Sequence, residues 1–274
     1  MERNARGHRL IESHANPVVK RARSLRDKKH RRAEGLFLAE GLRILTEARE
    51  AGVLPEQIFY AADRPVHPLA EMLFEAMEAS GREIIATSAD ILSRLSGKDN
   101  AQTLVGLYRD RIVPLSTIDR SAAPIWLVVQ AMRDPGNLGT VLRTGDAVGA
   151  GGVILIDECV DPFSVEAVRA SMGALFTQVI AAAPWEAFIG WLREGPGCLV
   201  ATSLAPGAVD YRSPDYPAPT FILTGNESRG LPPDYEAACD LRVKMPMLGK
   251  ADSLNAAVAT AVMAYRVLDR QGGA

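Results

Sequence analysis

The sequence of 274 residues is poor in the residue types that build metal sites and disulfide frameworks. Its cysteines are three in number and far apart: Cys159, Cys198 and Cys239. This spacing fits neither a zinc site nor a set of disulfides, so we expect no metal and a reducing compartment. All histidines occur early in the chain: His8, His14, His30 and His67. Any chemistry placed after residue 67 therefore has no histidine base of its own.

Long apolar runs are also missing. No stretch approaches the roughly 18 apolar residues of a membrane span, and the N-terminus has no apolar segment of the secretory type. We therefore expect a cytoplasmic protein that does not enter a membrane. The hydrophobic fraction of 47% is ordinary for folded proteins. The length exceeds the usual size of one domain and favours two.

Acidic residues are scarce in the first 35 positions, which hold eleven Lys or Arg against four Asp or Glu. That segment carries a net charge of +7, and the rest of the chain carries −9. We expect a basic amphipathic helix over residues 16–30 and mobile tails at 1–10 and 271–274. The basic residues in and just after this helix are candidate contacts to a polyanion such as a nucleic acid: Lys20, Arg21, Arg23, Arg26, Lys28, Lys29, Arg31 and Arg32. Charge alone does not separate a polyanion grip from a solvated helix face.

Helical and strand-like segments alternate over residues 1–110, which predicts a small α/β sandwich. The predicted strands are 37–39, 57–61, 83–87 and 103–108, and the predicted helices after the basic one are 40–51, 68–80 and 89–95. Residues 111–123 contain Pro114, Ser116, Thr117 and Ser121 and are expected to form a linker.

The remaining residues, 124–274, contain apolar runs of the buried-strand type. These runs are 125–129, 152–156, 198–201 and 220–223, with helical segments between them and a terminal helix over 256–268. The pattern predicts a mostly parallel sheet with helices on both faces. Ligands of such sheets bind beyond the carboxyl ends of the strands, so the loops there are the candidate site.

Three of these loops carry polar residues. The first runs from Asp134 to Thr144 and opens a helix; we expect Asn137 to cap that helix and to face the same cleft as Arg143. The second contains Gly225 and Glu227 after a strand. A plain strand-to-helix turn with a surface arginine explains the first loop about equally well, and for the second loop alone a plain turn is the better interpretation. No Walker or dinucleotide-binding glycine pattern is present, which counts against a nucleotide-dependent oxidoreductase.

The third loop leads from Met245-Pro246-Met247 to Ser253-Leu254-Asn255 and the terminal helix. A Ser or Asp cap on a core helix explains part of this sequence. It does not explain why Ser253 and Asn255 stand beside an apolar strand end.

In this order, Asn-x5-Arg, Gly-x-Glu-x-x-Gly-Leu and Met-Pro-Met…Ser-Leu-Asn resemble the three motifs of the SpoU/TrmH-type RNA 2′-O-ribose methyltransferases in the SPOUT superfamily. The resemblance covers residues 124–270 and includes Arg169–Ala174. Residues 16–20 through 37–41 are similar to the L7Ae/L30e-like substrate-binding domain found at the N-terminus of such enzymes, although this match is looser.

The resemblance implies S-adenosylmethionine as methyl donor, a deep trefoil knot near the C-terminus, and a homodimer with the active site at or near its interface. It implies a donor pocket formed by Thr202, Leu223, Gly225, Met245, Met247 and Leu254. It places around the reacting groups Arg143, Glu227, Ser253, Asn255 and Asn137. Family resemblance puts Arg143 next to the hydroxyl, sometimes as a base. Because a guanidinium releases its proton only above about pH 12, we favour phosphate binding and charge stabilisation for Arg143.

The expected substrate is RNA, and the N-terminal domain favours 23S ribosomal RNA. Two alternatives remain at this point: a transfer RNA 2′-O-methyltransferase and a non-catalytic RNA-binding protein on the same fold. Failure to bind the donor would favour the second alternative.

Overall fold

The computed structural model describes residues 2–97 and 103–272. The chain forms two compact units, of which the first comprises Met1–Asp110 with Asp161–Thr177 and the second Arg111–Val160 with Gln178–Ala274. Residues 161–177, placed by sequence in the C-terminal domain, thus pack with the first unit. The domain boundaries at 110 and 124 stay predictions.

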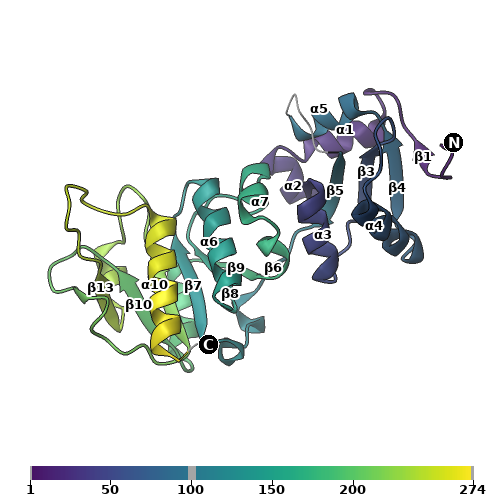
Figure 1. Ribbon diagram of the computed structural model, residues 1–274. Coiled ribbons are helices and arrows are strands. Elements are labelled where there is room, and N and C mark those ends of the chain that lie inside the picture. The colour runs from purple at the N-terminus through teal and green to yellow at the C-terminus, as the bar shows by residue number, and fades with distance from the viewer. Residues whose placement is uncertain (1, 98–102, 273–274) are drawn as a thin grey trace. The chain divides into compact units, whose positions relative to one another are not determined.

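The first unit contains a mixed five-stranded sheet (Figure 1). Its strands, in spatial order, are β1 (Arg9–Leu10), β4 (Glu83–Thr87), β3 (Gln57–Ala61), β5 (Leu104–Arg109) and β2 (Leu36–Glu40). Strands β1, β4 and β3 run parallel, and β5 is antiparallel to both β3 and β2.

Helices cover both faces of this sheet, as expected for an α/β sandwich. They are α1 (Pro17–Ser24), α2 (Lys28–Glu34), α3 (Leu42–Glu50), α4 (Pro68–Ala79) and α5 (Ala89–Ser96). Helices α1 and α5 bury Ala22, Ile91 and Leu95 in one core cluster with sheet residues such as Phe59. Helices α3 and α4 pack together and contact β2 and β4 respectively. The α/β prediction for this part is confirmed.

The single basic helix expected over 16–30 is wrong, because the chain leaves the helical path at residues 25–27. Leu25 is fully buried there, and Asp27 adopts an extended conformation before α2. The Arg31 guanidinium supplies hydrogen bonds to backbone carbonyls at the break. It donates to Leu25 O at 2.9 Å and to Arg26 O at 2.6 Å. Burial of one leucine, with an arginine cap on the exposed carbonyls, therefore divides the helix in two.

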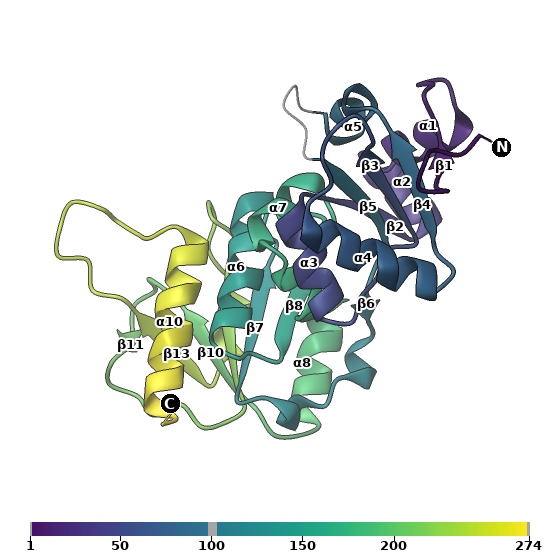
Figure 2. The same cartoon turned by 45° about the vertical axis from the view of Figure 1, so that its right-hand side comes forward.

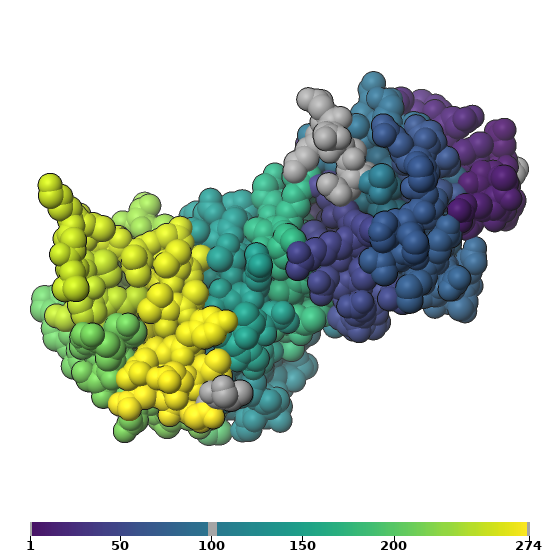
Figure 3. All heavy atoms as spheres, viewed as in Figure 1, coloured from purple at the N-terminus to yellow at the C-terminus, as the bar shows by residue number. Residues whose placement is uncertain are grey.

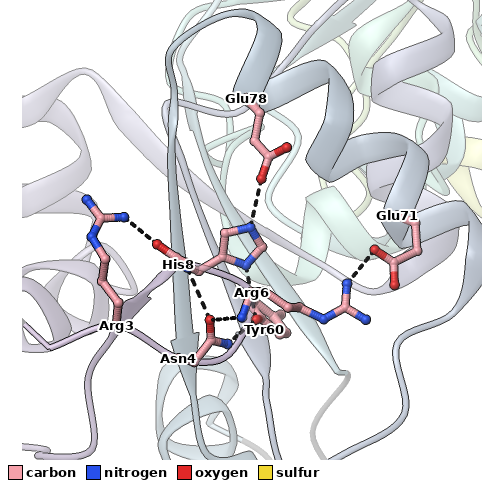
Figure 4. Close-up of polar contacts among 8 residues, drawn as sticks. Arg3, Asn4, Arg6, His8, Tyr60, Glu71 and Glu78 are labelled. Carbon is pink, nitrogen blue, oxygen red and sulfur yellow. Dashed lines mark hydrogen bonds and ion pairs between the residues drawn. The ribbon is translucent and has the colours of Figure 1, made fainter.

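The N-terminal segment is anchored rather than free, which corrects the mobile tail expected at 1–10 for its described residues. The His8 ring lies 3.0 Å from the Tyr60 hydroxyl through Nδ1 and 3.0 Å from the Glu78 carboxylate through Nε2 (Figure 4). Asn4 Nδ2 donates to the Tyr60 hydroxyl at 2.6 Å. At the other end of the chain, Gln271 Nε2 donates to Tyr216 O at 2.9 Å, so residue 271 is held as well.

Residues 161–177 form α7 (Val165–Ser171) and a short 3-10 turn at Ala174–Phe176. Two ion pairs and an aromatic stack hold them in the first unit. Arg31 binds Asp161 through both Nε (2.9 Å) and Nη2 (2.7 Å), and both side chains are nearly buried. Arg169 pairs with the buried Glu40, and Phe163 stacks on Phe37 with ring centroids 4.8 Å apart.

The second unit is built on an eight-stranded sheet in which all the strand pairings described are parallel. Its spatial order is β11 (Val209–Asp210), β13 (Leu241–Lys244), β10 (Cys198–Thr202), β12 (Thr220–Thr224), β7 (Ile125–Gln130), β8 (Gly152–Ile156), β9 (Val179–Ala183) and β6 (Ile112–Val113). The predicted parallel sheet is confirmed. The expected linker at 111–123 contributes β6, which pairs with β9.

Helices lie on both faces of this sheet (Figure 2). On one face α6 (Pro135–Ala147) packs against α10 (Ala256–Arg270), and both contact β7. On the other face α8 (Trp185–Arg193) buries Phe188 and Leu192 with Trp126 and Phe221, and α9 (Pro233–Ala237) follows β12. Because both faces are covered, the central strands are buried along their whole length.

The knot implied by the resemblance concerns how the chain is threaded, and it stays a prediction. Among the residues described, no helix is both long and apolar enough to cross a membrane.

Candidate active site

The first candidate loop leaves β7 and enters α6. Asp134, and not Asn137, caps this helix: its Oδ1 accepts a hydrogen bond from Asn137 N at 2.7 Å. The expectation for Asn137 as a cap is therefore wrong, because Pro135 begins the helix two residues earlier. As a residue of the first turn, Asn137 has its side-chain amide free to bind a neighbouring loop.

The second candidate loop, residues 225–231, folds back on itself after β12. Gly230 N donates to Asn226 O at 2.9 Å, and Asn226 Oδ1 accepts from Ser228 N and Arg229 N at 3.0 and 3.1 Å. A Cβ at Gly225 would lie 2.5 Å from Gly230 C and 2.6 Å from Leu231 N. Glycine is thus required at 225 by the loop's own backbone.

Glu227 in this loop joins it to the first loop. Its carboxylate accepts hydrogen bonds from Asn137 Nδ2 at 3.1 Å and from the backbone amides of Arg133 and Asp134, each at 3.3 Å. Asn255 Nδ2 donates in turn to Asn137 Oδ1 at 2.9 Å. Glu227, Asn137 and Asn255, one from each predicted motif, therefore form one hydrogen-bonded chain.

The pKa of Glu227 reflects this setting. Partial burial raises the pKa of the carboxyl, but the hydrogen bonds from Asn137 and the backbone outweigh burial, so the pKa lies below its ordinary value. Glu227 is consequently a fixed negative charge at neutral pH and a weak proton acceptor.

The third loop connects β13 to α10 and ends at Asn255. Asn255 Oδ1 caps α10 by accepting from Ala257 N at 2.9 Å and Val258 N at 3.2 Å, so this residue serves the helix and the amide chain together. Residues 248–254 of this loop are exposed, with Leu248 98% accessible, and the loop stands out from the surface of the second unit (Figure 3).

A cavity of about 410 Å³ lies where the second and third loops meet the ends of β10, β12 and β13. The predicted residues that line it are Thr202, Gly225, Glu227, Met245, Met247, Ser253 and Leu254. Leu223 lies behind the wall, and its carbonyl accepts a hydrogen bond from Thr202 Oγ1 at 3.4 Å. Asn137 and Asn255 are not among the lining residues and reach the cavity through Glu227.

Sequence reasoning missed further lining residues, including Ser203, Leu204, Thr224 and Glu236. Ser203 and Leu204 follow the carboxyl end of β10, so the strand-end rule applied to that strand had the signal to find them. Ser203 Oγ donates to Glu236 Oε1 at 2.7 Å, which ties the end of β10 to α9.

The cavity fits a nucleoside-containing methyl donor. Its volume lies within the roughly 300–1,000 Å³ typical of small-molecule pockets. Met245, Met247 and Leu254 offer an apolar surface for a flat base, and Thr202 and Thr224 offer hydroxyls beside it. The fixed carboxylate of Glu227 suits a positively charged ligand group.

Arg143 is not brought to this cavity, although we expected it to share a cleft with Asn137. Six residues along an α-helix correspond to about 600°, so the two side chains point about 120° apart. Arg143 is exposed on α6, and it forms no ion pair with any residue that the structure describes.

The candidate RNA contacts lie on α1, on α2 and in the break between them. Seven are exposed: Lys20, Arg21, Arg23, Arg26, Lys28, Lys29 and Arg32. Arg31 is 6% exposed and occupied by Asp161, so its assignment as an RNA contact is wrong. Arg21 is paired with Glu34 at 2.5 Å.

The cysteines are not among the residues that line the cavity, and all four histidines belong to the first unit. Burial raises the pKa of Cys159 and Cys198 to about 11 and that of Cys239 to about 12, so all three are thiols at neutral pH. His8, His14 and His67 are engaged in contacts within the first unit. No cluster of three or more potential metal ligands occurs among the described residues.

Comparison with known proteins identifies the class that this fold and these loops define. Residues 124–265 match the SpoU rRNA methylase family, and residues 16–106 match the MRM3-like substrate-binding domain. The chain belongs to the SpoU rRNA methylase family, which confirms the resemblance seen in the three motifs.

Individual relatives span nearly the whole chain. A 23S rRNA (uridine(2479)-2′-O)-methyltransferase of Streptomyces viridochromogenes is 31% identical and covers 91% of this chain and 88% of its own. A 23S rRNA (guanosine(2553)-2′-O)-methyltransferase of Bacillus subtilis is 27% identical, covering 94% and 98%. The AdoMet-bound rRNA methyltransferase of Sinorhizobium meliloti is 38% identical with a TM-score of 0.88, covering 95% of this chain and 97% of its own.

Proposed function

We propose that this protein transfers a methyl group from S-adenosylmethionine to a ribose 2′-hydroxyl of 23S ribosomal RNA. The observation that carries the proposal is the hydrogen-bonded chain from Asn255 through Asn137 to Glu227 at the wall of a donor-sized cavity. It unites residues of all three motifs at the carboxyl edge of the sheet. Relatives with this activity on 23S rRNA, aligned over nearly the full length, support the substrate class.

Donor binding is assigned to the cavity between β10, β12 and β13. S-adenosylmethionine would supply a methyl group on a sulfonium sulfur, which departs as a neutral thioether. Met245, Met247 and Leu254 would hold the adenine, and Thr202 and Gly225 would contribute polar atoms at the strand ends. Glu227, ionised at neutral pH, would balance the positive charge, and Ser253, which also lines the cavity, would contact the acceptor.

The acceptor hydroxyl must be oriented and must release its proton to solvent water as the new carbon–oxygen bond forms. No histidine follows residue 67, and the pKa of Glu227 is lowered, so neither offers a strong base. We assign to Arg143 the binding of the adjacent phosphate and the stabilisation of negative charge developing on the oxygen.

Because Arg143 is not among the residues that line the cavity of its own chain, we assign this role to the Arg143 of a second copy. We therefore propose a homodimer in which α6 and α10 face the partner. Val258 and Tyr265 on α10 are 47% and 54% exposed, and they supply apolar surface for such a contact. The trefoil knot and a cytoplasmic location are parts of the same proposal.

The test is mass spectrometry of ribosomal and transfer RNA from cells that lack this gene, beside the parent strain. We expect one 2′-O-methyl nucleotide to be missing from 23S rRNA and to be restored by the wild-type gene but not by Arg143→Ala. A mark missing from transfer RNA instead would overturn the substrate, and no missing mark together with no donor binding would overturn the activity. Purified Arg143→Ala should still bind the donor; if it does not, Arg143 is structural.

A further inference from the structure

A second large cavity, of about 650 Å³, lies within the first unit. It is lined by residues of α1 and its C-terminal end, by the end of α5, and by α7. The charged side chains among them are four cations and two carboxylates: Lys20, Arg23, Arg26, Arg169, Asp27 and Glu166. The cavity therefore draws both on the part matched by the substrate-binding model and on the part matched by the methylase model.

Three of these cations are available to a ligand. Lys20, Arg23 and Arg26 are exposed and form no ion pair with any residue in the described ranges. Arg169, in contrast, is occupied by the buried Glu40. Lys20 and Arg23 are three residues apart on one helix, which places them on the same face.

Arg26 is positioned by the shape of the cavity. A Cβ on Gly97 would lie 2.2 Å from Arg26 Nη2, so the guanidinium rests directly against the glycine that ends α5. The contact holds the guanidinium without an acidic partner, and its N–H donors remain for a ligand.

We propose that this cavity holds the phosphodiester backbone of the substrate RNA, with Lys20, Arg23 and Arg26 as the phosphate ligands. The inference rests on the proposed function and sharpens it, because it assigns the RNA grip to three cations and not to the whole basic segment. Lys28, Lys29 and Arg32 on α2 are also exposed but are not among the lining residues. Contacts of this kind are independent of base sequence and weaken with salt.

The experiment compares two triple variants of the full-length protein that remove the same charge. One is Lys20→Ala, Arg23→Ala, Arg26→Ala, and the control is Lys28→Ala, Lys29→Ala, Arg32→Ala. Binding of a labelled 23S rRNA transcript, with oligouridylate as competitor, is measured over a salt series. We expect the first variant to bind on the order of 10- to 100-fold more weakly and to lose about two units of salt slope. The control should stay within about three-fold of the wild type.

Misfolding is separated from loss of contact by a variant expected to act in the opposite direction. Glu166→Gln removes a negative charge from the cavity, so RNA binding should tighten about two- to five-fold. Glu186→Gln is the matched control, since Glu186 occupies the first turn of α8 outside the cavity. It should leave RNA binding unchanged.

Equal losses in the two triple variants, or no loss in either, would overturn the site. Equal methylation of RNA by the wild-type protein and by the Lys20→Ala, Arg23→Ala, Arg26→Ala variant would overturn the site and leave the proposed function standing. RNA binding that depends on the three cations, with donor binding but no methyl transfer to any RNA, would overturn the proposed function and leave the site standing.

Discussion

Two loops line the cavity of about 410 Å³, and they are held very differently. Residues 225–231 form what we call the closed loop, which is hydrogen-bonded to itself and anchored to the α6 entrance through Glu227 and Asn226. Residues 245–254 form the open loop; none of residues 246–254 hydrogen-bonds to another residue in the described part of the chain. Both line the same cavity.

Under the proposed function, the two loops have different tasks in the donor site: one balances a positive charge, and the other covers a flat base. A charge that balances a sulfonium has to be fixed before the ligand arrives, because reorganising it during reaction would cost free energy. An apolar surface that covers a flat base needs area more than orientation. The closed loop therefore carries the carboxylate, and the open loop carries methionines and leucines.

The largest effect is expected when the charge on the closed loop is removed. Glu227→Ala deletes the acceptor of three hydrogen bonds together with the only carboxylate of that loop. We expect kcat/KM for rRNA methylation to fall on the order of 10²- to 10³-fold, as for the loss of other fixed electrostatic groups. Glu158→Ala, which removes an exposed glutamate outside the cavity, is the control and should retain activity. Equal losses in both would mean that net charge matters and position does not.

A pair of glycines compares the two loops directly by stability. Gly225→Ala forces a methyl group against the backbone of Gly230 and Leu231 in the closed loop, which should cost about 1–3 kcal/mol in the free energy of unfolding. Gly249→Ala in the open loop meets no atom within 4 Å and should change stability by less than about 0.5 kcal/mol. Chemical denaturation of the two variants measures both values. Similar values for the two would show that the closed loop yields as readily as the open one.

Some strand boundaries were predictable from sequence alone, whereas the direction of one side chain and the break in one helix were not. Strands at 57–61, 83–87 and 152–156 are found at their predicted boundaries, because their apolar runs are continuous and end at polar residues. The three candidate loops were identified in the same way, because their polar residues follow apolar runs. The direction of Arg143 was missed because it depends on helical phase, and the break at 25–27 was missed because it depends on burial of Leu25.

Long-range contacts were beyond sequence patterns altogether. Arg31 and Asp161 are 130 positions apart, and nothing in either local pattern indicates that they pair. That pair, with Arg169 and Glu40, is why residues 161–177 belong to the first unit and why Arg31 is unavailable to RNA.

A smaller effect is expected where the two loops are joined. Asn255→Ala removes both the cap of α10 and the amide that reaches Asn137, at a cost of about 0.5–2 kcal/mol in the free energy of unfolding. Asn255→Ser keeps a capping oxygen but loses the amide donor. We expect it to retain most of the stability and still to show reduced turnover. Full activity in Asn255→Ser would mean that the amide chain has no part in the reaction.

The smallest effect is expected in the pH dependence of donor affinity that arises from the Glu227 carboxylate. Because the folded-state pKa of Glu227 lies below its ordinary value of 4.5, ionised Glu227 stabilises the closed loop above that pH, and its contribution disappears as the pH falls through the lowered pKa. Donor affinity, measured by calorimetry, should therefore be flat from neutral pH to about pH 5 as far as Glu227 is concerned. The ratio of wild-type to Glu227→Gln affinity isolates this group from the other carboxylates. If that ratio already declines between pH 7 and pH 5, the pKa of Glu227 is raised and the carboxylate is not held by its hydrogen bonds.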